Sequence, residues 1–276
     1  MENRSRPDYL IIGHVTHDLT PAGTTTGGTV AYSGLAAHAL GCRTFVVTSV
    51  GPDFDPTAEL PGLNVHIVPA AETTTFENIY TAEGRQQYIH HRAADIEAAH
   101  IPPDWKQAPI VHLAPIDMEI NPAIIQTFST GKIGITPQGW LRKWDESGKI
   151  GYKSWPPDAA VLSKAAVLVI SEEDMPPGEP LRPYREHVPI LVRTRGGKGC
   201  TVYQGEECYD FPAPQVQEVN PTGAGDIFAT AFLIRLHQTN SISEAAVFAN
   251  QIAAHSVTAQ TLPEKMSLIK QTWHSH

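Results

Sequence analysis

The sequence predicts an α/β protein whose mostly parallel sheet is covered on both faces. Short runs of β-branched and other apolar residues recur along the chain, and stretches rich in Ala and Leu separate them. Parallel strands that are buried on both faces read as near-continuous apolar runs, and their alternation with helices is typical of this class. At 276 residues the chain suits one large domain, because no internal repeat or low-complexity linker divides it.

The expected elements follow in chain order. Apolar runs predict strands at residues 9–12, 45–47, 65–68, 110–113, 132–135, 167–170, 190–192 and 200–203. Small residues predict a packed helix over 31–40, which Gly41 closes. A further helix-forming run at 227–233 comes directly after segment 220–226, which itself follows an extended apolar stretch at 215–219.

One segment departs from this alternation. Residues 74–80 and 87–90 alternate apolar with polar side chains and flank Glu83-Gly84, which predicts a β-hairpin with one solvated face. This hairpin is expected either at an edge of the main sheet or in a small sheet of its own.

Composition excludes several classes of protein. A net charge of −9 without a basic cluster argues against nucleic acid as a partner. No apolar run approaches the roughly 20 residues of a membrane span, and a polar start that leads into a strand predicts no signal peptide. Cys42, Cys200 and Cys208 show neither metal-ligand spacing nor the even number of a disulfide framework. These features predict a cytoplasmic protein.

The chain is also rich in histidine, with 13 residues. His14-x-x-His17-Asp18 and His90-His91 suggest a metal site, but neither has a second ligand pair nearby in the sequence. Solvated or substrate-facing imidazoles are therefore expected.

The most informative segment is 220–226, Asn-Pro-Thr-Gly-Ala-Gly-Asp. A tight glycine-rich turn at the start of a helix leaves N–H groups unpaired, and with the helix dipole these groups form an anion site. Because a carboxylate repels phosphate, Asp226 is best explained as a base that takes a proton from an attacking hydroxyl. The alternative is a packing turn in which Asp226 is merely a charge that the dipole favours.

Segment 220–226 resembles, at six of its seven positions, the C-terminal signature of the PfkB (ribokinase-like) sugar and nucleoside kinases. The resemblance extends from about residue 8 to about residue 263. It implies a single domain over 1–276, built as a three-layer αβα sandwich with a small β-sheet lid inserted at about 14–28 and 73–92. Such a lid excludes water, which competes as a phosphoryl acceptor, and often forms the contact of a homodimer.

The resemblance also implies the reaction: ATP-dependent, Mg²⁺-assisted phosphorylation of a hydroxyl on a small sugar, polyol or nucleoside. Asp226 would be the general base, and the N–H groups of Gly223, Ala224 and Gly225 would hold the γ-phosphate. In the family an Asp at position 220 helps to bind a monovalent cation, so Asn220 predicts weak activation by such a cation or none.

The acceptor site implied by the resemblance lies near the N-terminus. Asp18 matches an Asp that binds substrate hydroxyls, and Gly27-Gly28 matches a pair that lets a sugar approach the backbone. Tyr32 stands where the family usually has Asn, which favours an acceptor other than ribose. Taken alone, Asp18 would favour an Asx turn and Gly27-Gly28 a flexible loop, whereas their order and spacing favour the acceptor site.

The nucleotide site is implied by two matches. Thr194, Gly196 and Gly199 fit a Thr-x-Gly-x-x-Gly segment that wraps the nucleotide, and Thr222 belongs to the phosphate-binding turn. Asn250 fits the polar residue of a helix along the adenine. The alternatives are a glycine-rich hairpin turn and a plain core helix; no Walker A loop occurs in the chain.

A magnesium role is implied for Ser171 and Asp174, which occupy the two fixed positions of the family's Asn-x-x-Glu. Asp is shorter than Glu, so contact through water is expected. The alternative is a capping cluster for the next helix. Segment 136–142 replaces the family's Asp-x-Asn-x-Arg, which alters the wall between acceptor and nucleotide.

A second class of function stays open: a catalytically silent ligand- or nucleotide-binding protein. The departures at Tyr32, Thr136, Ser171 and Asn220 favour it, whereas the retained Asp226 argues against it. A nicotinamide oxidoreductase is excluded because no Gly-x-Gly-x-x-Gly follows the first strand.

Overall fold

The protein is described by a computed structural model that covers residues 6–21, 23–81, 84–176 and 178–274. Within these residues, nine strands form one sheet in the order β15-β14-β13-β12-β9-β8-β1-β4-β5. All neighbours from β13 to β5 pair in parallel, and β14 and β15 are antiparallel. The strands are β1 (Tyr9–Ile12), β4 (Thr44–Val50), β5 (Asn64–Pro69), β8 (Ile110–Leu113), β9 (Lys132–Ile135), β12 (Val167–Ser171), β13 (Ile190–Thr194), β14 (Cys200–Gln204) and β15 (Glu207–Phe211).

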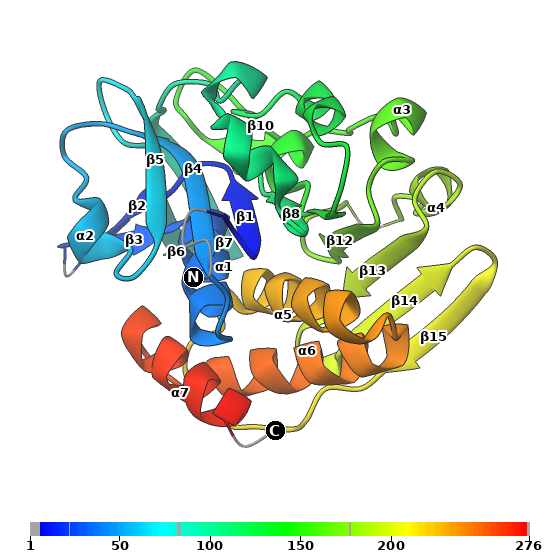
Figure 1. The fold of residues 1–276 in the computed structure, drawn as a ribbon. Helices are drawn as coiled ribbons and strands as arrows, with labels where there is room; N and C mark the ends of the chain where they lie inside the picture. The colour runs from blue at the N-terminus through cyan, green and yellow to red at the C-terminus, as the bar shows by residue number, and fades with distance from the viewer. Residues whose placement is uncertain (1–5, 22, 82–83, 177, 275–276) are drawn as a thin grey trace.

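The two faces of this sheet are covered differently (Figure 1). Four long helices lie below the strands in this view: α1 (Gly28–Ala39), α5 (Ala224–Thr239), α6 (Ile242–Ser256) and α7 (Leu262–His274). The other layer consists of short pieces, among them α3 (Ala159–Leu162), α4 (Arg182–Arg185) and the 3₁₀ helices η1 (Ala98–His100), η2 (Pro103–Gln107), η3 (Pro122–Thr127) and η4 (Gln138–Leu141). Two more short helices, α2 (Pro56–Glu59) and η5 (Gly196–Lys198), follow β4 and β13. The predicted α/β sandwich is confirmed.

The strands separate two hydrophobic cores because their side chains alternate between the faces. In β1, Tyr9 and Ile11 belong to the core under the long helices, and Leu10 and Ile12 belong to the core under the short ones. All four side chains are fully buried. A strand buried on both faces must be apolar at every position, which is why the continuous runs located these strands in the sequence.

The predicted hairpin lies in a separate sheet of four described strands, ordered β3-β2-β6-β7. These are β2 (Thr16–Thr20), β3 (Gly23–Gly27), β6 (Thr75–Thr81) and β7 (Gly84–His91). A short hairpin of β10 (Arg142–Trp144) and β11 (Ile150–Tyr152) connects this small sheet to the main domain. Phe76 and Ile89 of the small sheet pack with Ile116, Trp144 and Ile150. This part of the interface is therefore apolar.

Some boundaries differ from those expected. Helix α1 begins at Gly28, three residues before the expected start, so Gly27 is its N-cap rather than part of a preceding loop. Segment 215–219 is extended but belongs to no sheet, and its side chains are exposed. Among the described residues, no helix has both the length and the apolar character needed to span a membrane.

The chain reverses direction across the sheet between β1 and β8. From β1 it continues outward through β4 and β5, and from β8 it continues the other way through β9, β12 and β13. In open α/β sheets, ligands bind beyond the carboxyl ends of the strands at such a switch point. Gly13, which follows β1, and Ala114, which follows β8, meet at this point, and a Cβ on Gly13 would lie 2.3 Å from the carbonyl oxygen of Ala114.

Gly13→Ala tests this close approach. Gly13 has φ +155, and its missing side chain lets the two strand ends approach, so we expect the variant to lose about 2 kcal/mol of unfolding free energy. Urea unfolding followed by circular dichroism measures the loss. Gly151→Ala is the control, because the nearest atom to its added Cβ would be 3.9 Å away. Equal unfolding free energies for Gly13→Ala and Gly151→Ala would contradict a close approach of Gly13 to Ala114.

Candidate functional site

The candidate site is built around the turn that leads into α5. Gly223 adopts the left-handed conformation with φ +78 and forms the N-cap, and Asp226 lies in the first turn of the helix. The Ile227 N–H donates to the Gly223 carbonyl (2.9 Å), and the Ala224 N–H donates to that of Pro221 (3.0 Å). The Ala224 N–H is therefore already engaged, unlike the open group that the sequence predicted.

Asp226 is half-buried, and its carboxyl group has a pKa raised to about 7. Burial is the main cause, and the negative charge of Asp174 adds to it. A hydrogen bond from the Thr29 side chain and the positive charge of Arg142 act in the opposite direction. A carboxyl group that titrates near neutral pH is well matched to general-base catalysis.

Tyr32 forms a wall against the backbone of this turn. A Cβ placed on Gly223 would lie 2.0 Å from Cδ1 of Tyr32, so the ring packs directly on the glycine. Burial raises the pKa of Tyr32, and the charges of Asp18 and Asp226 raise it further. The Tyr32 ring therefore lies near both carboxylates, and it connects the expected acceptor residues with the base.

Asp18, Gly27 and Gly28 lie together as expected from their order. Strands β2 and β3 pair antiparallel, and a Cβ on Gly27 would lie 2.3 Å from Oδ2 of Asp18. Thr16 donates to Oδ1 of Asp18 (3.2 Å). Gly28 has φ +82, and a Cβ there would lie 2.9 Å from the carbonyl oxygen of His14. The two glycines thus let the small sheet approach the start of α1 closely.

Arg142 is a residue whose contribution the sequence did not reveal. Its guanidinium lies 5.9 Å from the centre of the Phe76 ring and donates to the Ile116 carbonyl (3.3 Å). Its charge also lowers the pKa of Asp226. Arg142 thus connects the small sheet, the loop after β8 and the base. Thr136, in the same segment, points inward instead and pairs with the buried His112 (3.0 Å).

The small sheet also presents an unsatisfied polar atom. Among the described side chains, Oδ1 of Asn78 is one of a few buried atoms that lack a hydrogen-bond partner. Asn78 follows Phe76 by two positions in β6, so the two side chains share a face of the sheet. The same face contacts the main domain at Ile116.

A cavity of about 220 Å³ is lined in part by Ala224 and Gly225 of the Gly223–Asp226 turn. Thr194, Gly196, Gly199 and Asn250, which the resemblance assigns to the nucleotide, line it, whereas Thr222 is exposed and does not. Its remaining lining is largely apolar and includes Pro214, Val216, Phe228, Ala253, Ala254 and Val257. The Thr194–Gly199 turn joins the antiparallel strands β13 and β14, so it is a hairpin turn as well as a cavity wall.

Asn250 lines this cavity and is also hydrogen-bonded to the neighbouring backbone. It is 4% exposed, and its Nδ2 donates to the Phe211 carbonyl at 3.0 Å. The amide nitrogen of Asn250 therefore holds the end of β15, and its contact with an adenine stays a prediction.

The expected metal residues lie on different sides of the strand end. Ser171 and Glu173 line the cavity. Asp174 accepts a hydrogen bond from Gln138 (2.8 Å) and raises the pKa of Asp226, which places it toward the base. The capping alternative fails, because α4 begins at Arg182 and its N-cap is Leu181.

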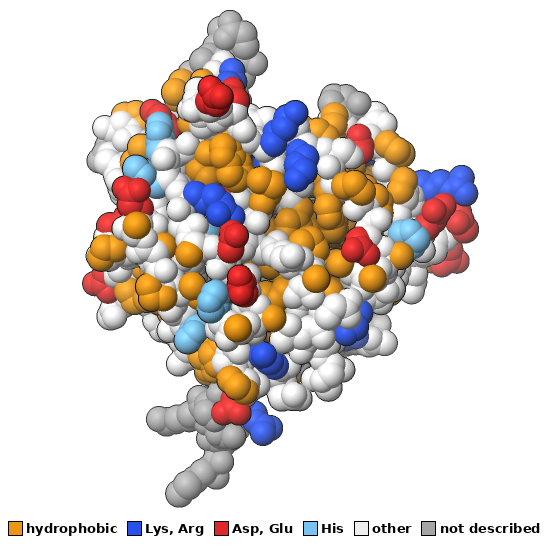
Figure 2. All heavy atoms as spheres, turned by 90° about the horizontal axis from the view of Figure 1, so that it is seen from above, with side chains coloured by type: hydrophobic (Ala, Val, Ile, Leu, Met, Phe, Trp, Pro, Cys, Tyr) orange, Lys and Arg blue, Asp and Glu red, His pale blue; other side chains and the backbone are white. Residues whose placement is uncertain are grey.

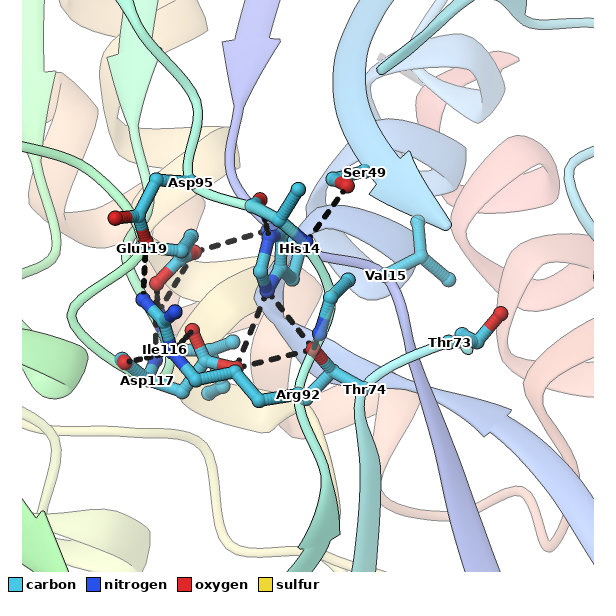
Figure 3. A network of polar contacts seen from close by, with 12 residues as sticks. His14, Val15, Ser49, Thr73, Thr74, Arg92, Asp95, Ile116, Asp117 and Glu119 are labelled. Carbon is cyan, nitrogen blue, oxygen red and sulfur yellow. Dashed lines mark hydrogen bonds and ion pairs between the residues drawn. The ribbon is translucent and has the colours of Figure 1, made fainter. Parts of the chain in front are cut away.

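A buried polar network joins the small sheet to the main sheet (Figure 3). Nδ1 of His14 pairs with Oδ2 of Asp117 (3.1 Å), and the hydroxyl of Thr74 contacts both. Nε2 of His14 donates to the Ala94 carbonyl (2.8 Å). Burial lowers the pKa of His14, but the neighbouring carboxylates of Asp117 and Glu119 outweigh it and leave the pKa raised. His17 takes no part and contacts Glu59 instead (3.2 Å).

Glu119 is the centre of this network. Its two carboxylate oxygens accept the backbone N–H groups of His14 (2.9 Å), Ile116 (2.9 Å) and Asp117 (2.9 Å). His14, Asp117 and Glu119 have a spacing that suits a metal ion. However, both Glu119 oxygens already accept backbone N–H groups, and Arg92 lies 3.7 Å from Asp117. Burial and the charge of Asp117 raise the pKa of Glu119 to about 7.

The face seen from above in Figure 2 is hollowed, with hydrophobic side chains in the hollow and charged ones around it. A second cavity, of about 640 Å³, is lined by residues that precede and follow β8, including Ile96, Glu119, Trp140, Lys153 and Trp155. The rings of Trp140 and Trp155 lie 4.7 Å apart. This cavity does not include the residues around Asp226.

Residues 182–265 match the family described as pfkB family carbohydrate kinase. The chain is 28% identical to an inositol 3-kinase of Oryza sativa subsp. japonica, over 92% of this chain and 69% of that protein. It is 26% identical to a cytidine kinase of Thermococcus kodakarensis, over 82% of this chain and 87% of the other.

Solved structures show the same fold at lower sequence identity. A pyrophosphate-dependent kinase of the ribokinase family, complexed with a pyrophosphate analog and myo-inositol, matches with a TM-score of 0.76 and 21% identity, over 90% of this chain and 94% of its own. The nucleoside kinase of Methanocaldococcus jannaschii matches with a TM-score of 0.73 and 17% identity, over 98% and 99%.

Glu119→Gln tests the buried network. The amide would turn an N–H₂ group toward backbone N–H donors, so we expect a loss of about 3 kcal/mol of unfolding free energy. Denaturant unfolding measures it. Glu186→Gln is the control. It removes an exposed ion pair with Arg182, so the loss of unfolding free energy should stay below about 1 kcal/mol. An equally small loss of unfolding free energy in both variants would show that Glu119 does not hold these backbone segments together.

Proposed function

Because the chain belongs to the PfkB family of ribokinase-like kinases, whose members phosphorylate hydroxyl groups, we propose that it transfers the γ-phosphate of ATP to a hydroxyl of a small polyol, sugar or nucleoside. One observation carries this proposal. Asp226, with a pKa raised to about 7, lies at a turn that has the carboxylate-bearing acceptor side on one face and an apolar cavity on the other. A base between two substrate sites is the arrangement that phosphoryl transfer requires.

In this mechanism Asp226 accepts the proton of the attacking hydroxyl. Thr29 fixes the carboxylate by a hydrogen bond, and Arg142 keeps part of it ionised by opposing the effect of burial. The N–H groups of Gly223 and Gly225 would meet the transferred phosphoryl group first, because that of Ala224 is engaged with Pro221. The positive end of the α5 dipole adds to this stabilisation.

The donor side fits a nucleotide better than bare pyrophosphate. Aliphatic side chains of the 213–216 segment and of α6 line the cavity, and Asn250 lies among them. An apolar slot suits an adenine ring, whereas pyrophosphate would leave that slot without a ligand. Ser171 and Glu173 line the same cavity, so their oxygens fit a hydrated Mg²⁺, which when bound would neutralise phosphate charge.

On the acceptor side the chemistry favours a neutral polyhydroxy compound. Asp18 and Asp226 both act on Tyr32, and carboxylates accept hydrogen bonds from vicinal hydroxyls but repel a phosphorylated substrate. The Phe76 ring offers an apolar surface, and the unpaired Oδ1 of Asn78 offers one more acceptor. Similarity to an inositol 3-kinase makes cyclic polyols the first compounds to test.

We also propose that the small sheet closes over the acceptor. Its strands carry Asp18 and Phe76, so movement of the sheet would carry two acceptor contacts with it and exclude water. A homodimer through this sheet stays a prediction, and the exposed Leu19 and Ile79 mark the surface that it would use.

Asp226→Asn tests the catalytic assignment. We expect kcat to fall at least about 100-fold while ATP binding stays near that of the wild type, because only proton removal is lost. Phosphate transfer would be followed by ADP release from Mg-ATP against inositols, other polyols, sugars and nucleosides, with pyrophosphate as a second donor. Calorimetry would measure ATP binding.

The outcomes separate the functions. Turnover that depends on one acceptor class and is lost in the variant supports the kinase and names its substrate. ATP binding without turnover against every acceptor would favour a catalytically silent binding protein. Turnover with pyrophosphate alone would overturn the donor assignment, and a variant with full kcat would remove Asp226 from the mechanism.

The pH dependence of kcat/KM tests the charges around the base. Asp226 must be ionised to accept a proton, so kcat/KM should fall as the pH drops below about 7. Asp174→Asn removes a negative charge that raises this pKa, so the acidic limb should move to lower pH. Arg142→Met removes a cation that lowers the pKa, so the limb should move upward. If the acidic limb of the kcat/KM profile stays at the same pH in both variants, the titration belongs to a group other than Asp226.

A further inference from the structure

Lys265, on α7, is fully buried, which is rare for a lysine. Its ammonium group donates to two backbone carbonyls, those of Asn220 and Ser256, the latter at 3.1 Å. Burial lowers the pKa of Lys265, and the Glu218 carboxylate opposes this shift. A buried cation persists only where it is well paired, so this position has a structural reason.

One of these carbonyl groups lies at the end of a helix, and the other lies at the start of the turn before another helix. Ser256 is the last residue of α6, where the final carbonyls lack partners within the helix and the dipole favours a cation. Asn220 begins the turn that leads to Gly223 and α5. The Val257 carbonyl joins the two ends, since it accepts the N–H groups of Val219 (2.8 Å) and Asn220 (3.0 Å).

The hydrogen bond from the ammonium group therefore fixes the orientation of the Asn220 peptide at the start of the turn. With its carbonyl oxygen directed to Lys265, the Asn220 peptide cannot direct that oxygen toward a bound phosphate. The Asn220 side chain is fixed as well, because Oδ1 accepts the Thr222 N–H (3.0 Å) and Nδ2 donates to the Gln260 carbonyl (2.7 Å). Glu218 and Pro221, on either side of Asn220, line the donor cavity.

We propose that the Lys265 ammonium group is a built-in cation that shapes the anion-binding turn at 220–226 and makes a dissolved monovalent cation unnecessary. The inference rests on the proposed kinase function and extends it to how the donor site is held. It gives a physical reason for the weak cation activation that Asn220 predicts. Lys265 is a positioning residue, because it acts through the backbone of Asn220.

A lysine that merely stabilises the fold would change the melting temperature, but it would not change how the protein responds to potassium. The decisive comparison is therefore between KCl and tetramethylammonium chloride at equal ionic strength. The two readouts are kcat/KM for Mg-ATP and the melting temperature without substrates. The variants are Lys265→Met, which keeps the bulk of the side chain without its charge, and Lys265→Ala, which leaves space. Lys270→Met, on the exposed side of the same helix, is the control.

We expect the wild type and Lys270→Met to behave alike in both salts. Lys265→Met should lose about tenfold in kcat/KM, the scale of one lost charge-assisted hydrogen bond, in either salt. Lys265→Ala should lose a similar factor in tetramethylammonium and recover part of it in KCl, with a higher melting temperature, because K⁺ can occupy the space among the carbonyls.

Several results would overturn the inference: stimulation of the wild type by KCl, a Lys265→Met variant with full kcat/KM, or no effect of KCl on Lys265→Ala. If the alanine variant does not fold, the salt response of the wild type and the methionine variant still decides. If the wild type phosphorylates no acceptor, the proposed function fails, whereas the potassium dependence of the melting temperatures still tests Lys265.

Discussion

The Glu119 carboxylate is the interaction on which the rest of the site depends. By accepting backbone N–H groups of His14 and Ile116, it joins the segment after β1 to the segment after β8, where the sheet changes direction. The small sheet starts from the first segment, and Arg142 is held by the Ile116 carbonyl in the second. The segments around Asp226 are therefore tied together by a buried carboxylate. Backbone hydrogen bonds to both oxygens oppose the cost of burial, but burial and the charge of Asp117 still raise the pKa of Glu119 to about 7.

The electrostatics of the base reflect opposing effects at one carboxyl group. Burial and Asp174 favour the protonated form of Asp226, whereas Thr29 and Arg142 favour the ionised form. With burial and Asp174 alone, Asp226 would be neutral at physiological pH. With Thr29 and Arg142 alone, its carboxylate would be too weak a base for the proton removal that we propose. A balance near neutrality follows from residues on four different segments, which only the folded chain brings together.

Sequence analysis located those features whose signal is local. The 9–12 strand and its counterparts are apolar at every position, and the 220–226 turn combines its glycines and its carboxylate within seven residues. Arg142 and Lys265 were not identified, because their roles depend on partners such as Phe76 and Asn220, 66 and 45 positions away in the chain. Burial was the missing signal: no local pattern distinguishes a lysine that is enclosed between two helix ends from one on a solvated face. The layer of short 3₁₀ helices was missed for a related reason, since one-turn elements have no period to detect.

The contact between Tyr32 and Gly223 has a thermodynamic consequence. One aromatic ring lies near the carboxylates of Asp18 and Asp226, which we propose act on the acceptor, and also rests on the turn that would hold the phosphate. An acceptor that shifts this ring changes the space available to the Gly223 backbone, and a phosphate that orders the turn restricts the ring. The two ligands are thus linked through one shared element, and linkage is reciprocal: whatever factor the first substrate imposes on the affinity of the second, the second imposes on the first. A single tyrosine would make the binding of the two substrates cooperative without any change in subunit arrangement.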